Sequence, residues 1–197
     1  MTSIDVLLLK LPARRIDAAG VRELAAALRD VAPPLRHIAA HAAIESVESY
    51  VYLALRQPGV PHLGPLQDAL ARTEPGAQLM PLQMMMSVAG ASAGQPAPFH
   101  YVVETDVAQG GEDDLNAWYD QEHLPGLASV PGTVLAQRLS DPTGSPRYHA
   151  LYELETQETF GSPAWLKVRA SPWSDRVRPL FRNPKRTMFH HVLTMEL

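Results

Sequence analysis

The sequence predicts an α+β protein in which the order β-α-β-β-α-β occurs twice and the two copies close into one intramolecular barrel. A stretch of small and turn-forming residues divides the chain near its middle, so we expect a first unit at residues 1–91, a linker at 92–98 and a second unit at 99–197. A sheet of this kind carries helices on one face only. Two copies can therefore cover each other's bare faces.

The first half reads as four strands and two helices. Strands are expected at residues 4–11, twice within 35–56, and at 79–88, with helices at 17–31 and just before Pro75. The first strand is a compact apolar run ended by Pro12, which is typical of a strand buried on both faces. The helix at 17–31 has apolar residues at helical spacing and stops at a pair of prolines.

The second half repeats this order without obvious residue identity. Strands are expected at 99–107, 133–139, 147–154 and 187–196, with helices at 113–128 and, less regularly, at 162–180. Asp113 and Asp114 place negative charge where the N-terminal dipole of a helix favours it. The start of that helix is therefore well specified.

Composition narrows the classes of function. The net charge is −4 with scattered basic residues, which argues against nucleic-acid binding, and the chain has no cysteine. No apolar stretch approaches the ~20 residues of a membrane helix, and no basic leader precedes the first strand, so we expect a cytoplasmic protein without a membrane partner. Glycine-rich phosphate loops, serine nucleophile elbows and metal-ligand spacings are absent, so we expect no nucleotide cofactor and no metal.

The most specific segment is Trp118-Tyr119-Asp120-Gln121-Glu122-His123-Leu124-Pro125, followed by Val130-Pro131-Gly132 and by Arg138 on the next strand. This segment resembles the dimeric α+β barrel superfamily, and more narrowly its EthD-like and related uncharacterised members. The resemblance implies a ferredoxin-like fold, a cavity for a small hydrophobic or aromatic molecule, and homodimers as a further option. Members include cofactor-free monooxygenases, lactone isomerases, cyclases, dehydratases and haem-binding branches, so the fold alone does not select a reaction.

His123 and Glu122 are the candidate catalytic residues. Pro125 has no N–H, so we expect the helix to break or kink just beyond His123 and leave a free carbonyl beside the imidazole. That carbonyl and Glu122 would raise the pKa of His123 and make it a proton donor. The alternatives are a helix-capping role for His123 and a solvated Glu122. Trp118 and Tyr119, four residues before this pair, form either a substrate-binding wall or ordinary core.

Strand alternation supplies further candidates for substrate binding. His149 and Glu153 share one face of their strand, opposite Tyr148 and Tyr152, and His100 lies on a similar polar face. With Arg138 these side chains either line the barrel and orient a substrate or form ion pairs between the sheets. Both readings stay open from the sequence.

The leading hypothesis is a cofactor-independent enzyme of small-molecule catabolism or secondary metabolism, of isomerase, dehydratase, cyclase or monooxygenase type. His123 would move a proton, with Arg138 and His149 anchoring a substrate oxygen. One rival is haem chemistry with a histidine as axial ligand. The other is a non-catalytic ligand-binding or stress-associated protein whose cavity is filled by the methionines of residues 80–86.

Overall fold

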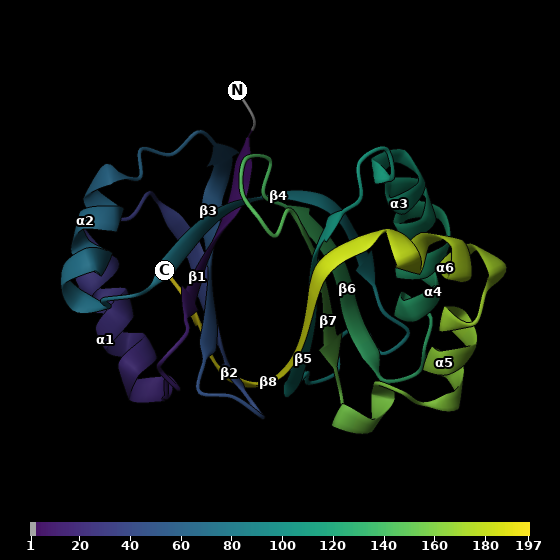
Figure 1. The fold of residues 1–197 in the computed structure, drawn as a ribbon. Coiled ribbons are helices and arrows are strands. Elements are labelled where there is room, and N and C mark those ends of the chain that lie inside the picture. Colours follow the sequence, from purple (N-terminus) through teal and green to yellow (C-terminus); the bar gives the residue numbers. More distant parts are fainter. Residues whose placement is uncertain (1–2) are drawn as a thin grey trace. The chain divides into compact units, whose positions relative to one another are not determined.

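The computed structural model describes residues 3–197 and contains two compact units. The first unit contains the chain up to Gln83 together with Phe189–Leu197, and the second contains Met84–Met188. In Figure 1, α1 and α2 lie against one face of the strands of the first unit, and α3 to α6 lie against one face of the strands of the second. The α+β class predicted from the sequence is confirmed.

The first unit has the ferredoxin-like order. Its elements are β1 (Ile4–Leu11), α1 (Ala18–Leu28), β2 (Leu35–Ala43), β3 (Ser49–Gly59), α2 (Gly64–Thr73) and the start of β4 (Gln78–Ala89). The strands run antiparallel in the order β4-β1-β3-β2, and the last residues of β8 (Phe181–Glu196) pair with β2. This order is the split βαββαβ arrangement.

The core of the first unit forms where α1 packs on the sheet. Leu7, Leu8 and Leu9 are fully buried, as expected for a strand covered on both faces, and Leu7 and Leu9 belong to the same apolar cluster as Val21 of α1. Asp17 caps α1 by accepting a hydrogen bond from the backbone N–H of Gly20 at 2.8 Å. The helix ends three residues earlier than predicted.

The second unit repeats the arrangement with more irregular helices. It contains the end of β4, β5 (Phe99–Val107), α3 (Glu112–Trp118), a π-helical turn (Tyr119–His123), α4 (Leu124–Ala128), β6 (Thr133–Ser140), β7 (Tyr148–Leu154), α5 (Pro163–Arg169), α6 (Pro172–Val177) and the start of β8. Its strand order is β8-β5-β7-β6, with the end of β4 beside β6. The irregular stretch predicted at 162–180 resolves into α5, α6 and a 3₁₀ turn at Arg178–Leu180.

The segment after β4 is tied to the second unit. Gly90, Ala91 and Ser92 donate backbone hydrogen bonds to the carbonyls of Val134, Ala128 and Thr133, at 2.8–2.9 Å. The divisions between the compact units fall within β4 and β8. Within the described residues, no helix combines the length and apolar character needed to cross a bilayer.

The Val130-Pro131-Gly132 turn owes its glycine to two local constraints. Gly132 has φ +91°, which L residues rarely adopt, and a Cβ placed there would lie 2.2 Å from Oγ1 of Thr159. Gly110 also has positive φ, at +78°, but a Cβ there would meet no atom within 4 Å. A substitution at Gly110 would therefore cause backbone strain alone, whereas one at Gly132 would cause backbone strain and steric overlap.

We predict that Gly132→Ala destabilises the protein more than Gly110→Ala. Backbone strain alone should cost Gly110→Ala about 1–2 kcal/mol, while the added overlap with Thr159 should bring Gly132→Ala to roughly 2–4 kcal/mol. Urea unfolding followed by circular dichroism measures both. Equal losses would show that Thr159 moves aside without cost.

Candidate active site

The helix that carries the EHxP motif widens at the motif instead of breaking. α3 runs into the π turn, where the N–H of Leu124 bonds to the carbonyl of Tyr119, and α4 continues to Ala128. In a regular α-helix the ring of Pro125 would clash with the carbonyl of Gln121. A π turn accommodates the proline because it inserts one residue into the helical ladder. Of the two outcomes that the sequence allows, the structure excludes the break and shows an irregular, widened turn at the motif.

The π turn sets which side chains meet. Trp118 stacks on His123 with ring centroids 4.0 Å apart and planes at 19°, and Tyr119 meets the same imidazole edge-on at 5.3 Å. Regular helical spacing would instead place Trp118 over Glu122. Trp118, Tyr119 and His123 are all buried.

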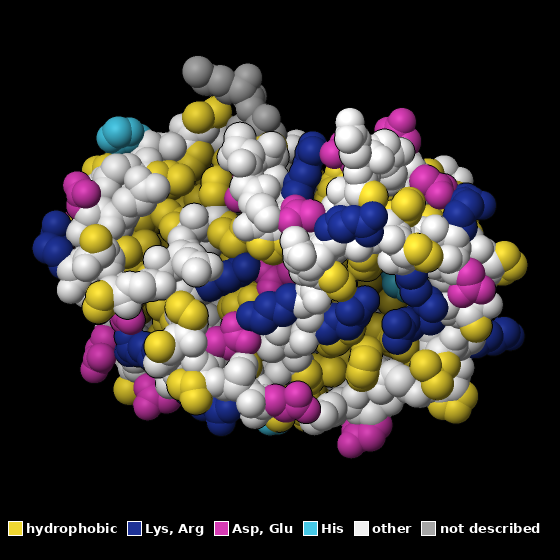
Figure 2. Space-filling model, in the orientation of Figure 1, with side chains coloured by type: hydrophobic (Ala, Val, Ile, Leu, Met, Phe, Trp, Pro, Cys, Tyr) yellow, Lys and Arg dark blue, Asp and Glu magenta, His cyan; other side chains and the backbone are white. Residues whose placement is uncertain are grey.

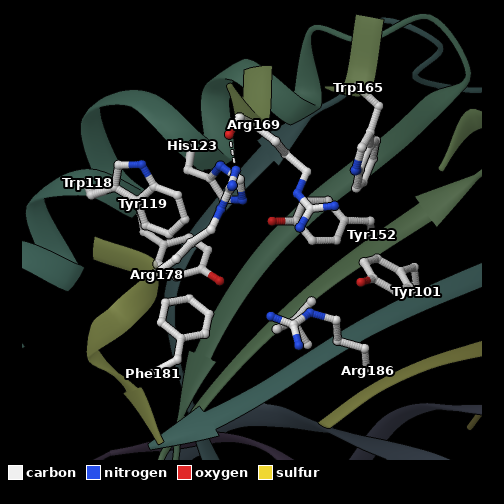
Figure 3. A pocket seen from close by; sticks show the side chains of 11 residues that line it. Tyr101, Trp118, Tyr119, His123, Tyr152, Trp165, Arg169, Arg178, Phe181 and Arg186 are labelled. Carbon is white, nitrogen blue, oxygen red and sulfur yellow. Dashed lines mark hydrogen bonds between the residues drawn. The ribbon is translucent and has the colours of Figure 1, made fainter. Parts of the chain in front are cut away.

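These rings line a small pocket between the helices and the sheet of the second unit (Figure 3). Tyr101 and Tyr152 contribute from β5 and β7, and Trp165 from α5. The cavity measures about 30 Å³, which is room for water or for a head group of a few atoms. An organic ring cannot be enclosed without movement of the side chains around it.

Three arginines reach the same pocket from separate segments. Arg169 ends α5, Arg178 lies in the 3₁₀ turn and Arg186 lies on β8. Arg178 donates a hydrogen bond to the backbone carbonyl of Arg169, and none of the described residues that line the pocket is acidic. Figure 2 shows basic side chains gathered over apolar surface on the second unit. The pocket is therefore positively charged and largely aromatic.

The environment of His123 keeps its imidazole neutral. Burial, and then the charges of Arg169 and Arg178, lower the pKa of His123 to about 3. The sequence prediction of a raised pKa is wrong, because burial disfavours the charged imidazole and two cations approach it from α5 and the 3₁₀ turn. Nδ1 of His123 is buried without a hydrogen-bond partner. The imidazole is thus neutral and has a buried ring nitrogen open to a hydrogen bond, although its low pKa makes it a weaker base than a free imidazole.

Several other polar atoms of the pocket-lining residues are buried without a partner. They are the hydroxyl of Tyr152 and the indole nitrogens of Trp118 and Trp165. Burial raises the pKa of Tyr152 well above its usual value and that of Tyr119 to about 12. Both phenols are protonated at neutral pH, so the hydroxyl of Tyr152 and the two indoles offer hydrogen-bond donors at the pocket.

Glu122 points to a different neighbour. It accepts a hydrogen bond from the hydroxyl of Ser171, whose oxygen caps α6 by accepting from the N–H of Ser174 at 3.0 Å. Glu122 is half-buried and is not among the residues that line the pocket. The structure therefore places it where it anchors α6 to the π turn.

Arg138 lies beside the pocket but does not line it. Its guanidinium donates to Oδ1 of Asn116 at 2.7 Å, lies 3.7 Å from Asp120 Oδ1, and packs over the rings of Tyr119 and Tyr148. The side chain is fully buried, and burial lowers its pKa. Arg138 therefore packs on the ring of Tyr119 without lining the pocket itself.

The polar strand residues form two His–Glu pairs on the sheet face opposite Tyr101 and Tyr152. Nδ1 of His100 lies 2.8 Å from Oε1 of Glu153, and Nδ1 of His149 lies 3.4 Å from Oε1 of Glu104. Each pair joins residues that are direct partners on β5 and β7. The structure brings His100 and Glu153 together, but it does not bring them or His149 to His123.

Sequence reasoning therefore found Trp118, Tyr119 and His123 of the pocket, and missed the rest. Arg169, Arg178 and Arg186 come from a stretch without periodicity, where nothing in the sequence indicates convergence. Tyr152 lies in the core cluster of the second unit, on the face opposite His149 and Glu153 as strand alternation predicts. Nothing in the sequence indicates that Tyr152 also lines a pocket on that face.

Comparisons with known proteins show the fold. No family model and no curated protein matches the sequence. Among solved structures, a protein proposed to be a monooxygenase from Lactobacillus acidophilus NCFM matches with TM-score 0.65 and 10% identity, over 99% of this chain and 97% of that chain. An anthrone oxidase-like protein matches with TM-score 0.60 and 16% identity, over 98% and 93%. A heme-degrading enzyme from Listeria monocytogenes matches with TM-score 0.53 and 10% identity, over 94% and 98%.

We predict that His123 makes the folded protein lose stability in acid. Its pKa is about 3 when folded and 6.5 in the reference state, so below pH 6.5 the unfolded chain binds a proton that the folded chain does not. The free energy of unfolding should fall by about 1.4 kcal/mol per pH unit from this group alone, and hardly at all above pH 7.

Urea unfolding between pH 7.5 and pH 4.5 measures this slope. His123→Gln should flatten it, whereas His62→Gln, at an exposed position of the first unit, should leave it unchanged. An unchanged slope in His123→Gln would show that the imidazole is protonated in the folded state.

Proposed function

We propose that the chain is a cytoplasmic, cofactor-independent enzyme that acts on a small hydrophobic or aromatic molecule, with His123 as proton acceptor. The observation that carries this proposal is the buried, neutral imidazole whose Nδ1 has no partner and which lines a pocket. The motif that resembles EthD-like proteins supplies this histidine. Proteins of the same fold include one proposed to be a monooxygenase and an anthrone oxidase-like protein.

The pocket suits removal of a proton from a conjugated carbon or oxygen acid. A neutral imidazole can accept that proton, and a positioned base of this kind typically contributes 10²–10⁴-fold to a rate. The resulting oxyanion would lie near the guanidinium groups of Arg169 and Arg178, which stabilise developing negative charge. Trp118 holds the imidazole ring by stacking on one face. Isomerisation, dehydration, cyclisation and oxygenation all can begin with such a step.

A haem does not fit at His123. Trp118 covers one face of the imidazole, and the adjoining cavity of about 30 Å³ is far too small for a macrocycle. The fold likeness to a heme-degrading enzyme therefore finds no matching site beside this residue. A Soret band in the purified protein that is lost in His123→Gln would contradict this conclusion.

We further propose that the two units close into one barrel, as the sequence predicts. In support, β4 begins in the first unit and ends in the second, and β8 begins in the second unit and ends in the first. A closed single-chain barrel has no bare sheet face and should be monomeric by native mass spectrometry at micromolar concentration. Obligate dimers would favour two open units that pair between chains.

We predict that His123→Gln abolishes proton transfer. Anthrone, 1-naphthol and a set of conjugated lactones would be incubated with the protein in deuterated buffer, with deuterium uptake followed by NMR and oxygen consumption by electrode. The variant should lower the enzyme-dependent rate by 10²–10⁴-fold, while His62→Gln should not change it. An unchanged rate in His123→Gln would exclude this histidine as the base.

A further inference from the structure

We propose that the pocket of the second unit binds the carboxylate of a planar organic acid, held by Arg169, Arg178 and Arg186 and by the hydroxyl of Tyr152. This inference rests on the proposed function in placing the ligand beside His123. It adds the charge class of that ligand, which the sequence motif does not indicate.

The first step is the charge imbalance of the pocket. Three other arginines of the second unit have acidic partners: Arg138 has Asp120, Arg147 has Glu112 and Arg176 has Asp114. Arg182, outside the pocket, donates to backbone carbonyls instead. Among the described residues, the three pocket arginines have no such ion pair. Like charges that converge on a partly buried space repel each other, and the pKa of Arg178 is lowered by burial and then by Arg169. A bound anion would remove this repulsion.

The second step is the buried donor at the centre of the pocket. The side chain of Tyr152 is 1% exposed and its hydroxyl has no hydrogen-bond partner. In Figure 3 this hydroxyl points toward Arg178 and the middle of the pocket. A buried donor without an acceptor costs about 1–3 kcal/mol, so such a group is normally satisfied by water or a ligand. An anionic oxygen between Tyr152 and Arg178 would accept hydrogen bonds from the hydroxyl and from the guanidinium.

The size of the cavity and the shape of the head group limit which ligand can bind. A cavity of about 30 Å³ admits a head group of a few atoms, so the rest of the ligand must lie toward the rim. Guanidinium groups bind the planar carboxylate through paired hydrogen bonds. Beside Arg186, the rings of Tyr101 and Phe181 line the same pocket and offer apolar surface to a planar ligand. These features favour an aromatic carboxylate over a bulkier tetrahedral phosphate.

The fourth step connects the ligand to the base. Arg169 and Arg178 help to lower the pKa of His123, so a carboxylate bound between them would raise that pKa toward its usual value. The imidazole would then become a stronger base only when the acid is in place. Ligand binding and the protonation of His123 should therefore be coupled.

The test is calorimetric titration of the full chain with benzoate and 2-naphthoate, using benzamide and inorganic phosphate as comparisons. Benzoate or 2-naphthoate should bind, benzamide should bind at least tenfold more weakly, and binding should weaken as salt is raised. Arg178→Gln should lower the affinity at least tenfold and Tyr152→Phe roughly threefold to tenfold. Arg22→Gln, an exposed arginine of the first unit, should leave it unchanged.

The exposed Arg186 provides a variant that keeps the core intact, should Arg178→Gln or Tyr152→Phe fail to fold. Arg186→Gln should also weaken binding of the carboxylates, and NMR should show the pKa of His123 rising when the wild-type protein is saturated. Equal binding of benzoate and benzamide, full affinity in Arg186→Gln, tighter binding of phosphate, or no binding of either carboxylate would each overturn the proposal.

The carboxylate site and the catalytic role of His123 can each be rejected without the other. Arginine-dependent binding of carboxylates by a protein whose proton-transfer rate survives His123→Gln would uphold the anion site and reject the base. A His123-dependent reaction on neutral compounds, without any preference for carboxylates, would do the reverse.

Discussion

The site depends on one backbone constraint, the missing N–H of Pro125. Because the proline cannot complete a regular helical ladder with Gln121, the helix takes an extra residue into the turn Tyr119–His123. That extra residue rotates His123 under Trp118, where the two rings stack. It also leaves Glu122 facing Ser171. The proline thus selects which residue of the Glu-His pair enters the pocket.

Much of the fold follows from local sequence signals. The apolar run of β1, the helical spacing of α1 and the alternation of Tyr148, Ala150 and Tyr152 in β7 each predict the observed element and its buried face. These signals are short-range, and packing agrees with them. The structure differs from the prediction in the helix around Pro125. The sequence does not show whether a proline ends a helix or widens it.

The candidate site could be predicted only in part, for a related reason. Trp118, Tyr119 and His123 lie within one helical segment, so spacing brings them together. Arg169, Arg178 and Arg186 come from α5, a 3₁₀ turn and β8, and their convergence is a tertiary effect. The sign of the His123 pKa shift was missed for the same reason. Local neighbours favour the cationic imidazole, whereas burial and two distant arginines favour the neutral form.

Burial and the charges of the arginines together determine which ligand the pocket can bind. A buried imidazole nitrogen without a partner is unfavourable, and the like charges of the three pocket arginines repel one another. Both features lie around the same small cavity. One negatively charged oxygen would relieve both, since it accepts from the guanidinium groups and from the hydroxyl of Tyr152 and opposes the charges that keep His123 neutral. The polar groups that the fold leaves unsatisfied therefore describe the ligand better than the motif does, because the motif specifies a base but not what the base acts on.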